Sequence, residues 1–173
     1  MKKIIAILIF MFFNAINGQN SQIDSLIMFT NEVVNEMNKI NDWDEVIDYK
    51  IDNFSFENAS LKTFSKYKKD IKIVLESSNQ HVKLVKIYYL KKDKLLYVLA
   101  RETQYKEMQD AKNSNKVAQE VFETKSYFED DILVRQLDNT DAGCLFSHDY
   151  LTAEGSSILD ELKVLKQLIA SAK

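Results

Sequence analysis

Glycine and proline are nearly missing from this sequence. Its 173 residues contain no proline and three glycines, of which Gly18 lies in a segment that we expect to be removed. A phosphate-binding loop or a dinucleotide-binding turn needs several closely spaced glycines, because only glycine lets backbone amides approach the phosphates. A nucleophile elbow needs a glycine on each side of its serine. The sequence therefore excludes these three kinds of site.

The first 18 residues predict a cleavable secretory signal peptide. Lys2 and Lys3 precede an apolar run over residues 4–13, and Gly18 supplies the small residue that a signal peptidase needs. The run is shorter than the about 20 apolar residues of a membrane span. A buried N-terminal element is the alternative, but polar residues follow the run at once. We therefore expect one exported domain over residues 19–173, periplasmic or secreted, with no transmembrane span in the mature chain.

Charge and cysteine content narrow the function classes further. The formal net charge is -3, and it becomes -5 when Lys2 and Lys3 leave with the signal. An acidic exported chain without a basic surface across the whole domain is not expected to bind nucleic acid. The single cysteine, Cys144, cannot form an intrachain disulfide, so the domain must rely on an ordinary core. Its thiol is expected to be buried as a small apolar group.

Two segments have the apolar spacing of amphipathic helices. The first covers residues 23–40, with Ser21 or Asn20 as its cap. The second covers residues 156–172, with Ser156 or Ser157 as its cap and acidic residues in its first turn. We expect these helices to flank the rest of the domain.

Strands are predicted between the two helices. Alternating or β-branched stretches cover residues 46–51, 71–75, 81–90, 95–105, 117–128 and 132–137, and turn-forming residues separate them at 77–79, 92–93 and 129–131. Residues 53–67 are ambiguous, and residues 106–116 are predicted to be a loop. The fold class is therefore α+β, an antiparallel β-meander of about five to six strands flanked by an N-terminal and a C-terminal amphipathic helix.

Two hairpin stretches resemble a recurring type of small exported protein from Bacteroidota. Residues 86–98 read KIYYLKKDKLLYV, and residues 126–139 read SYFEDDILVRQLDN. In proteins of that type a tyrosine pair, a turn and Lys-Leu recur in hairpins, and a strand ending in Arg-x-Leu-Asp-Asn precedes a C-terminal helix. The turns here lack the glycine that is usual there, and Gln136 stands where an aromatic residue is common. The type is uncharacterised, so the resemblance implies a compartment and a fold but no function.

Candidate catalytic or metal-binding residues are few. Cys144 and His148 are four residues apart with Asp149 adjacent, so a thiol nucleophile or a metal site can be imagined there, with His81 as a further member. Neither the ligand number of a zinc site nor a base aimed at the thiol is evident, and a surface position for His148 is the simpler interpretation. No cofactor is expected.

Lysines are concentrated in the middle of the chain. Residues 61–94 contain ten basic and three acidic side chains, a net charge of +7, with aromatic residues among them. Such a strip can attract an anionic glycan, a lipid head group or an acidic protein. The alternative is that these lysines solvate strand faces and edges and pair with acidic segments. The candidate contacts are Lys66, Lys68, Lys69, Lys83, Lys86, Lys91 and Lys92.

These observations favour a non-enzymatic binding or interaction module of the cell envelope that uses the lysine-rich sheet region. An enzymatic role stays open, in the form of a small envelope hydrolase with a site near Cys144 and His148. A third alternative is a subunit that assembles through the sheet face opposite the helices.

Overall fold

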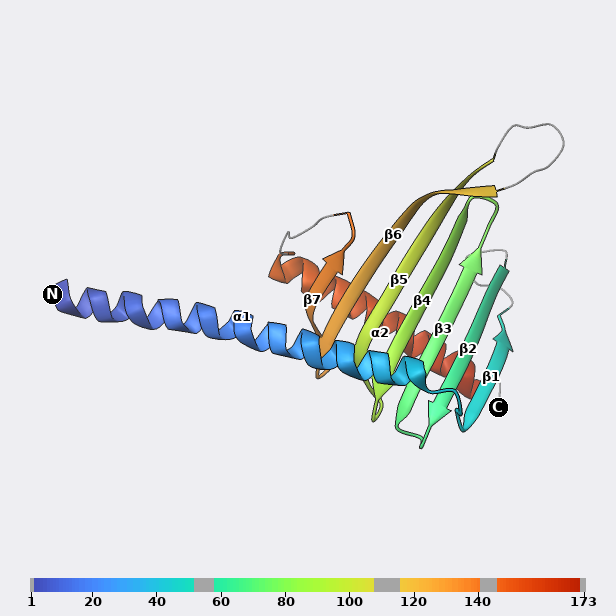
Figure 1. The fold of residues 1–173 in the computed structure, drawn as a ribbon, viewed down its shortest axis with the longest axis horizontal. Coiled ribbons are helices and arrows are strands. Elements are labelled where there is room, and N and C mark those ends of the chain that lie inside the picture. The colour runs from blue at the N-terminus through green and yellow to red at the C-terminus, as the bar shows by residue number, and fades with distance from the viewer. Residues whose placement is uncertain (1, 52–57, 108–115, 141–145, 172–173) are drawn as a thin grey trace. The chain divides into compact units, whose positions relative to one another are not determined.

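A computed structural model describes residues 2–51, 58–107, 116–140 and 146–171. These residues form, in chain order, a long helix, seven strands and a second helix. The elements are labelled in Figure 1. The chain divides into two compact units, Met1–Asn38 and Lys39–Lys173. The first unit is helical, and the second contains the sheet and the C-terminal helix.

Helix α1 (Lys2–Lys39) contains the amphipathic helix that was predicted over residues 23–40. The predicted start at a Ser21 or Asn20 cap is wrong, because the helix runs unbroken through both residues. Among residues 21–39 of this helix, the buried side chains recur at helical spacing and all belong to the predicted apolar stripe. They are Thr30, Val33, Val34 and Met37.

The seven strands form one antiparallel sheet in which each strand pairs with its neighbours in the chain. They are β1 (Glu45–Lys50), β2 (Asn58–Lys66), β3 (Asp70–Ser78), β4 (Val82–Lys91), β5 (Lys94–Glu107), β6 (Lys116–Glu129) and β7 (Ile132–Asp138). The order β1 to β7 across the sheet is that of a simple meander, as the sequence predicted.

The expected number of five to six strands is too low by at least one. The additional strand is β2, which lies in the stretch that the sequence left ambiguous; residues 52–57 of that stretch are outside the described parts. The predicted loop over residues 106–116 is also too long, since β5 extends to Glu107 and β6 begins at Lys116. Residues 108–115 are likewise outside the described parts.

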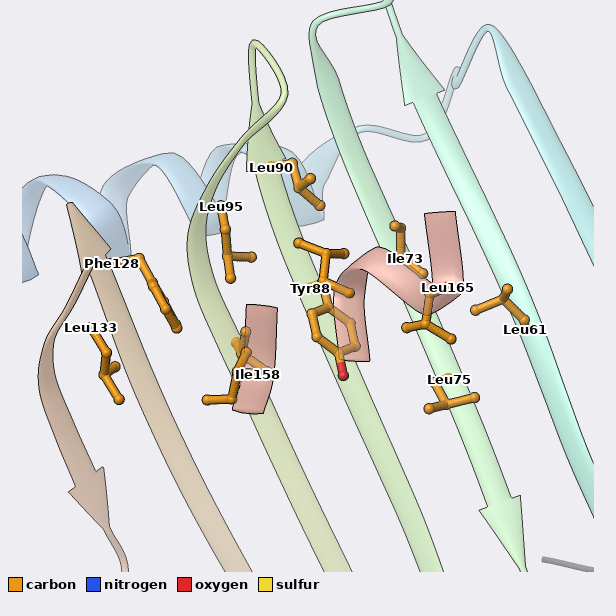
Figure 2. Packing of buried hydrophobic residues seen from close by; sticks show 12 residues of the cluster. Leu61, Ile73, Leu75, Tyr88, Leu90, Leu95, Phe128, Leu133, Ile158 and Leu165 are labelled. Carbon is orange, nitrogen blue, oxygen red and sulfur yellow. The ribbon is translucent and has the colours of Figure 1, made fainter. Parts of the chain in front are cut away.

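One face of the sheet holds the core. Cross-strand partners such as Leu61 with Leu75 and Ile73 with Tyr88 place their side chains on the same face, because side chains alternate along a strand. Figure 2 shows these side chains gathered against the C-terminal helix. The buried cluster consists of Leu61, Ile73, Leu75, Tyr88, Leu90, Leu95, Val98, Phe128, Leu133, Ile158, Leu162 and Leu165.

The C-terminal helix α2 (His148–Ser171) begins eight residues before the predicted start at Ser156. Its cap is Ser147, whose hydroxyl accepts a hydrogen bond of 3.2 Å from the Tyr150 amide. Gly155 therefore lies inside the helix, where glycine costs about 1 kcal/mol relative to alanine. A β-carbon at this position would stand 2.9 Å from the Leu133 β-carbon, so the glycine permits the close approach of α2 to β7.

Replacing Gly155 with alanine is expected to destabilise the protein, although alanine is the better helix former. The added methyl meets a β-carbon that is fixed to the strand backbone. Overpacking of this kind costs about 1–3 kcal/mol, whereas the gain in helix propensity is at most about 1 kcal/mol. Urea unfolding of Gly155→Ala measures the balance. The neighbouring exposed change Ser156→Ala is the control and should shift stability by less than about 0.5 kcal/mol. A stabilised Gly155→Ala protein would contradict the close packing.

A polar contact also fixes α2 on the sheet. Glu161 accepts hydrogen bonds from the Tyr88 hydroxyl and from the Lys86 ammonium, both at 2.7 Å. The Lys86 and Glu161 side chains are each about one-quarter exposed, so this ion pair is partly shielded from water. A charge-assisted bond in such a setting is stronger than one at an open surface.

Candidate functional site

Three hairpin turns lie at the same end of the sheet, because alternate turns of a meander share an end (Figure 1). They connect β2 to β3, β4 to β5, and β6 to β7, and we call them together the turn end (residues 66–70, 91–94 and 129–132). The Lys92 amide donates to the Lys69 carbonyl oxygen at 2.7 Å, which joins the first two turns. Lys94 forms an ion pair with Asp130, which joins the second turn to the third.

Six residues of the turn end have a left-handed backbone, and none is glycine. The two-residue loops of β4–β5 and β6–β7 require positive φ at both positions, where glycine is the residue of lowest cost. For other residues the left-handed conformation costs roughly 1–2 kcal/mol each, less for aspartate. Strained residues cluster at functional sites, so this end of the sheet is a candidate functional site. The six residues are Tyr67, Lys68, Lys92, Asp93, Asp130 and Asp131, with φ between 49° and 65°.

Lys66, one of the predicted contact lysines, is engaged by two carboxylates. Its ammonium lies 3.0 Å from an Asp42 oxygen and 3.1 Å from an Asp44 oxygen. The hydrogen bond from Lys66 lowers the pKa of Asp42, and the same contact raises the pKa of Lys66. The pKa of Asp44 is lowered mainly by the Tyr67 amide, which donates to it at 2.6 Å. Lys66 is therefore occupied within the fold.

Four predicted contact lysines come together on the first two turns and are exposed. We call Lys68, Lys69, Lys91 and Lys92 the lysine corner. None of the four is in an ion pair with another described residue. The acidic residue Asp70 lies opposite Lys91 in the strand register, so the corner is not free of negative charge. Its lysines nevertheless outnumber the two aspartates of these two turns.

The other two predicted contact lysines lie elsewhere. Lys83 pairs with Glu76 at 3.0 Å, between β4 and β3. Lys86 points to α2 and pairs with Glu161, as described above. The predicted set of seven therefore divides into the lysine corner and three lysines that are held in ion pairs.

An open groove of about 500 Å³ lies between α2 and two of the hairpin turns. Asp93 and Asp131 line it from the β4–β5 and β6–β7 turns, and Lys163 and Lys166 line it from the helix. The sequence interpretation missed all four residues. Aspartates at turns are usually structural, but the three-residue spacing of the two lysines on the predicted helix could have indicated a shared side.

The sheet face opposite the core carries a row of tyrosines. Tyr97 lies between Tyr89 and Tyr127, with ring centroids 5.7 and 5.0 Å apart, and all three are buried. On the same face Lys72 lies 4.5 Å from the centroid of the Phe64 ring, and burial lowers the pKa of this lysine. These contacts are packing contacts, and aromatic pairs of this kind stabilise a sheet face.

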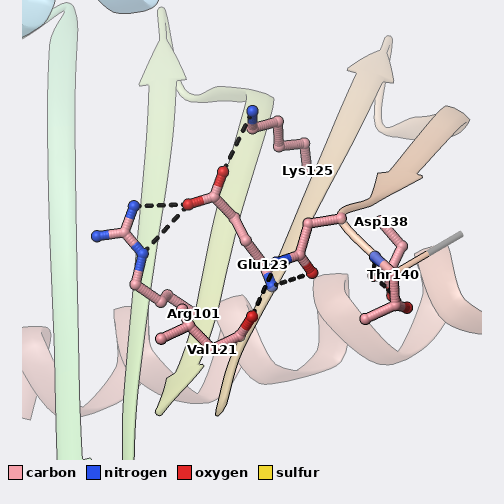
Figure 3. Close-up of polar contacts among 7 residues, drawn as sticks. Arg101, Val121, Glu123, Lys125, Asp138 and Thr140 are labelled. Carbon is pink, nitrogen blue, oxygen red and sulfur yellow. Dashed lines mark hydrogen bonds and ion pairs between the residues drawn. The ribbon is translucent and has the colours of Figure 1, made fainter. Parts of the chain in front are cut away.

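Figure 3 shows a polar cluster further along this face. Glu123 accepts hydrogen bonds from Arg101 at 2.6 Å and lies 3.2 Å from the Lys125 ammonium. The hydrogen bond from Arg101 is the main reason that the pKa of Glu123 is lowered. The Asn139 side chain continues the pairing of β6, accepting from the Glu123 amide and donating to the Val121 carbonyl. The cluster therefore fixes the end of β7 against β6.

The residues of the hydrolase alternative are not assembled by the described structure. His81 is exposed in the turn before β4, and His148 and Asp149 are exposed at the start of α2. Cys144 lies outside the described residues. Over the described ranges, no three histidine, cysteine, aspartate or glutamate side chains are grouped so that they could hold a metal ion.

Comparison with known protein families, curated proteins and solved structures finds no match for this chain. Among the described residues, no helix has the length and apolar character needed to cross a membrane.

Proposed function

We propose that the chain is an exported, non-enzymatic binding module of the cell envelope, and that the lysine corner contacts an anionic partner. The observation that supports this proposal most directly is the state of its lysines. Four exposed ammonium groups stand on two hydrogen-bonded turns, while Lys66 and Lys94 beside them are neutralised by aspartates. Lys68 and Lys92 occupy left-handed positions where glycine would cost less.

The chemistry that fits this corner is a surface or polymer with closely spaced phosphate, carboxylate or sulfate groups. A lysine near an anionic surface contributes about 1 kcal/mol, so four contribute about 4 kcal/mol. Since about 1.4 kcal/mol is a tenfold change in affinity, the corner can change affinity by several hundredfold at low salt. The contribution shrinks as salt screens exposed charges.

Neutralising the corner is expected to weaken binding to a polyanion strongly. The variant Lys68→Gln/Lys69→Gln/Lys91→Gln/Lys92→Gln should bind at least a hundredfold more weakly at low salt, because it removes the four unpaired charges. The assay uses anionic lipid vesicles, neutral vesicles and a soluble sulfated polysaccharide. Binding to the vesicles alone would identify a membrane surface, and binding to the polysaccharide alone a glycan.

The matched control removes the same number of charges elsewhere. Lys62→Gln/Lys83→Gln/Lys106→Gln/Lys125→Gln has the same net charge as the corner variant. Three of these lysines already pair with acidic residues and the fourth is an exposed strand residue. We expect a change of less than about threefold with this control, because its lysines lie away from the corner. Equal losses in the two variants would mean that binding depends on net charge alone and would contradict the proposal.

Export is the second part of the proposal and rests on the signal-like sequence of residues 1–18. The protein recovered from the periplasm or the medium is expected to begin at Gln19, because Gly18 supplies the small residue before the cleavage point. Intact-mass measurement and N-terminal sequencing check this. Replacing both Lys2 and Lys3 with glutamate should slow processing. A chain that keeps Met1 and stays in the cytoplasm would contradict export.

A further inference from the structure

We propose that the groove between α2 and the β4–β5 and β6–β7 turns is a second site, which binds a small zwitterion with an apolar body, such as a short peptide with free ends. The groove has a volume of about 500 Å³. This lies within the range of about 300–1,000 Å³ that small-ligand sites occupy. The site uses residues other than the lysine corner and so goes beyond the function proposed above.

The turn side of the groove is acidic. Asp93 and Asp131 line it, and both stand at left-handed positions that glycine could fill at lower cost. The Asp93 carboxylate has no hydrogen bond or ion pair with any other described residue. Asp131 receives a long contact of 3.4 Å from the Leu95 amide, while the ammonium of Lys94 is taken by Asp130. Both carboxylates can therefore accept a hydrogen bond from a ligand ammonium.

The helix side of the groove is basic. Lys163 and Lys166 are three residues apart on α2, and such a pair lies on one side of a helix. Lys166 reaches across to the Asp93 carbonyl oxygen at 3.4 Å, which is a backbone group and not the carboxylate. Neither lysine is in an ion pair within the part of the chain that the structure describes. Both ammonium groups can therefore bind a ligand carboxylate.

Apolar side chains also line the groove. Leu159 and Leu162 line the groove, and Leu162 is continuous with the buried core. The aspartates and the lysines line the same groove but do not pair with one another. This arrangement fits a ligand with a positive charge at one end and a negative charge at the other. A polyanion would meet the two aspartates, and a polycation would meet the two lysines. A zwitterion with an apolar middle satisfies both charged sides and covers the partly exposed Leu159.

The test measures binding of leucyl-leucine and of its N-acetylated, C-amidated form to the purified protein by calorimetry, with amide chemical shifts as a second readout. The free dipeptide is expected to bind at least tenfold more tightly than the blocked form. It should shift the amides of Asp93, Asp131 and Lys163. Leucine and trileucine, each free and blocked, test the span between the two charged sides.

Two variants assign the charges. Asp93→Asn/Asp131→Asn should weaken the free dipeptide at least tenfold and leave an N-acetylated, free-acid dipeptide unchanged. Lys163→Gln/Lys166→Gln should also weaken the free dipeptide at least tenfold. It should leave binding of a free-amine, C-amidated dipeptide unchanged. Asp160→Asn and Lys106→Gln, exposed and outside the groove, are the controls and should change neither.

The outcomes separate this site from the lysine corner. Equal binding of the free and blocked peptides, or no binding of any probe at millimolar concentration, would overturn the zwitterion site. Loss of dipeptide binding in the four-lysine corner variant, with the groove variants unaffected, would overturn it as well. Failure of the corner to bind polyanions, with the dipeptide results as expected, would overturn the proposed function and leave the groove standing.

Discussion

Replacing Phe128 with alanine should lower the free energy of unfolding by about 3–5 kcal/mol. The Phe128 ring is completely buried in the core beneath α2, at the end of β6 (Figure 2). The strand pairing shifts at a β-bulge between Tyr127 and Phe128. The backbone conformation there is fixed by this bulge, so the backbone has little freedom to move into a cavity. The cavity left by the ring would therefore collapse only in part. Total stabilities of about 5–15 kcal/mol make this a large fraction of the whole.

The same hairpin supplies a matched control. Ile132 is also a large apolar residue, but it is 64% exposed at the start of β7. Ile132→Ala should cost less than about 0.5 kcal/mol, because little apolar area is lost from the interior. Urea unfolding of both variants gives the comparison. A Phe128→Ala protein that loses less than about 1 kcal/mol would show that the ring does not fill the core between the sheet and α2.

The protein should lose stability steeply above pH 10. Burial is the main cause that raises the pKa of Tyr88 far above its ordinary value of 10, and the Glu161 carboxylate adds to it. Burial likewise raises the pKa of Tyr97, with the neighbouring Tyr127 as the next cause. In the unfolded chain both hydroxyls release their protons near pH 10, while in the folded protein both keep them. The stabilisation is therefore complete below pH 10 and falls as the pH rises.

Each proton that the folded protein retains lowers the free energy of unfolding by about 1.4 kcal/mol per pH unit. The two tyrosines together therefore lower it by roughly 5 kcal/mol between pH 10 and 12. Urea unfolding at intervals from pH 8 to 11.5 measures the slope. Tyr88→Phe loses the hydrogen bond to Glu161, which costs about 1–3 kcal/mol at neutral pH. The same variant should remove about half of the alkaline slope. An unchanged slope in Tyr88→Phe would mean that this hydroxyl ionises in the folded state.

Most of the sheet could be predicted from the sequence because its strands alternate or are rich in β-branched residues. Strand β2 lacked this signal. Leu61 faces the core, but Lys62 pairs with Asp48 and Lys66 with Asp42 on the other face, so neither face is uniformly apolar. Burial of such a strand depends on neighbours that are distant in sequence, and local alternation does not reveal it.

The start of α2 was missed for a physical reason as well. Gly155 and the two serines after it are typical of a helix boundary, and they hide an apolar stripe that continues through the glycine. Leu151, Gly155 and Ile158 share that stripe, and the glycine stands where α2 approaches Leu133. A close approach between two elements is a tertiary property, and it overrides the helix propensity of the residue.

The lysine content of the candidate site could be predicted from the sequence, but the ion pairs that its lysines form could not. Local sequence indicates a lysine-rich segment, yet the register decides which lysines stay unpaired. Lys66, at the end of β2, meets Asp42, which lies just before the paired strand β1. Lys86 meets Glu161 from a helix 75 residues further on. The groove depends even more on assembly, since its aspartates come from two turns and its lysines from α2.

The salt dependence of polyanion binding tests the central proposal most directly. Affinity of the mature domain for the sulfated polysaccharide is measured by titration at several salt concentrations between 25 and 200 mM, for the wild type and the four-lysine corner variant. Four released counterions predict a slope of roughly -3 for log affinity against log salt, at about 0.7 per contact as for a flexible polyanion. The corner variant should show a slope near zero at the affinities that can still be measured. Equal slopes in the two proteins would place the binding surface elsewhere and contradict the proposal.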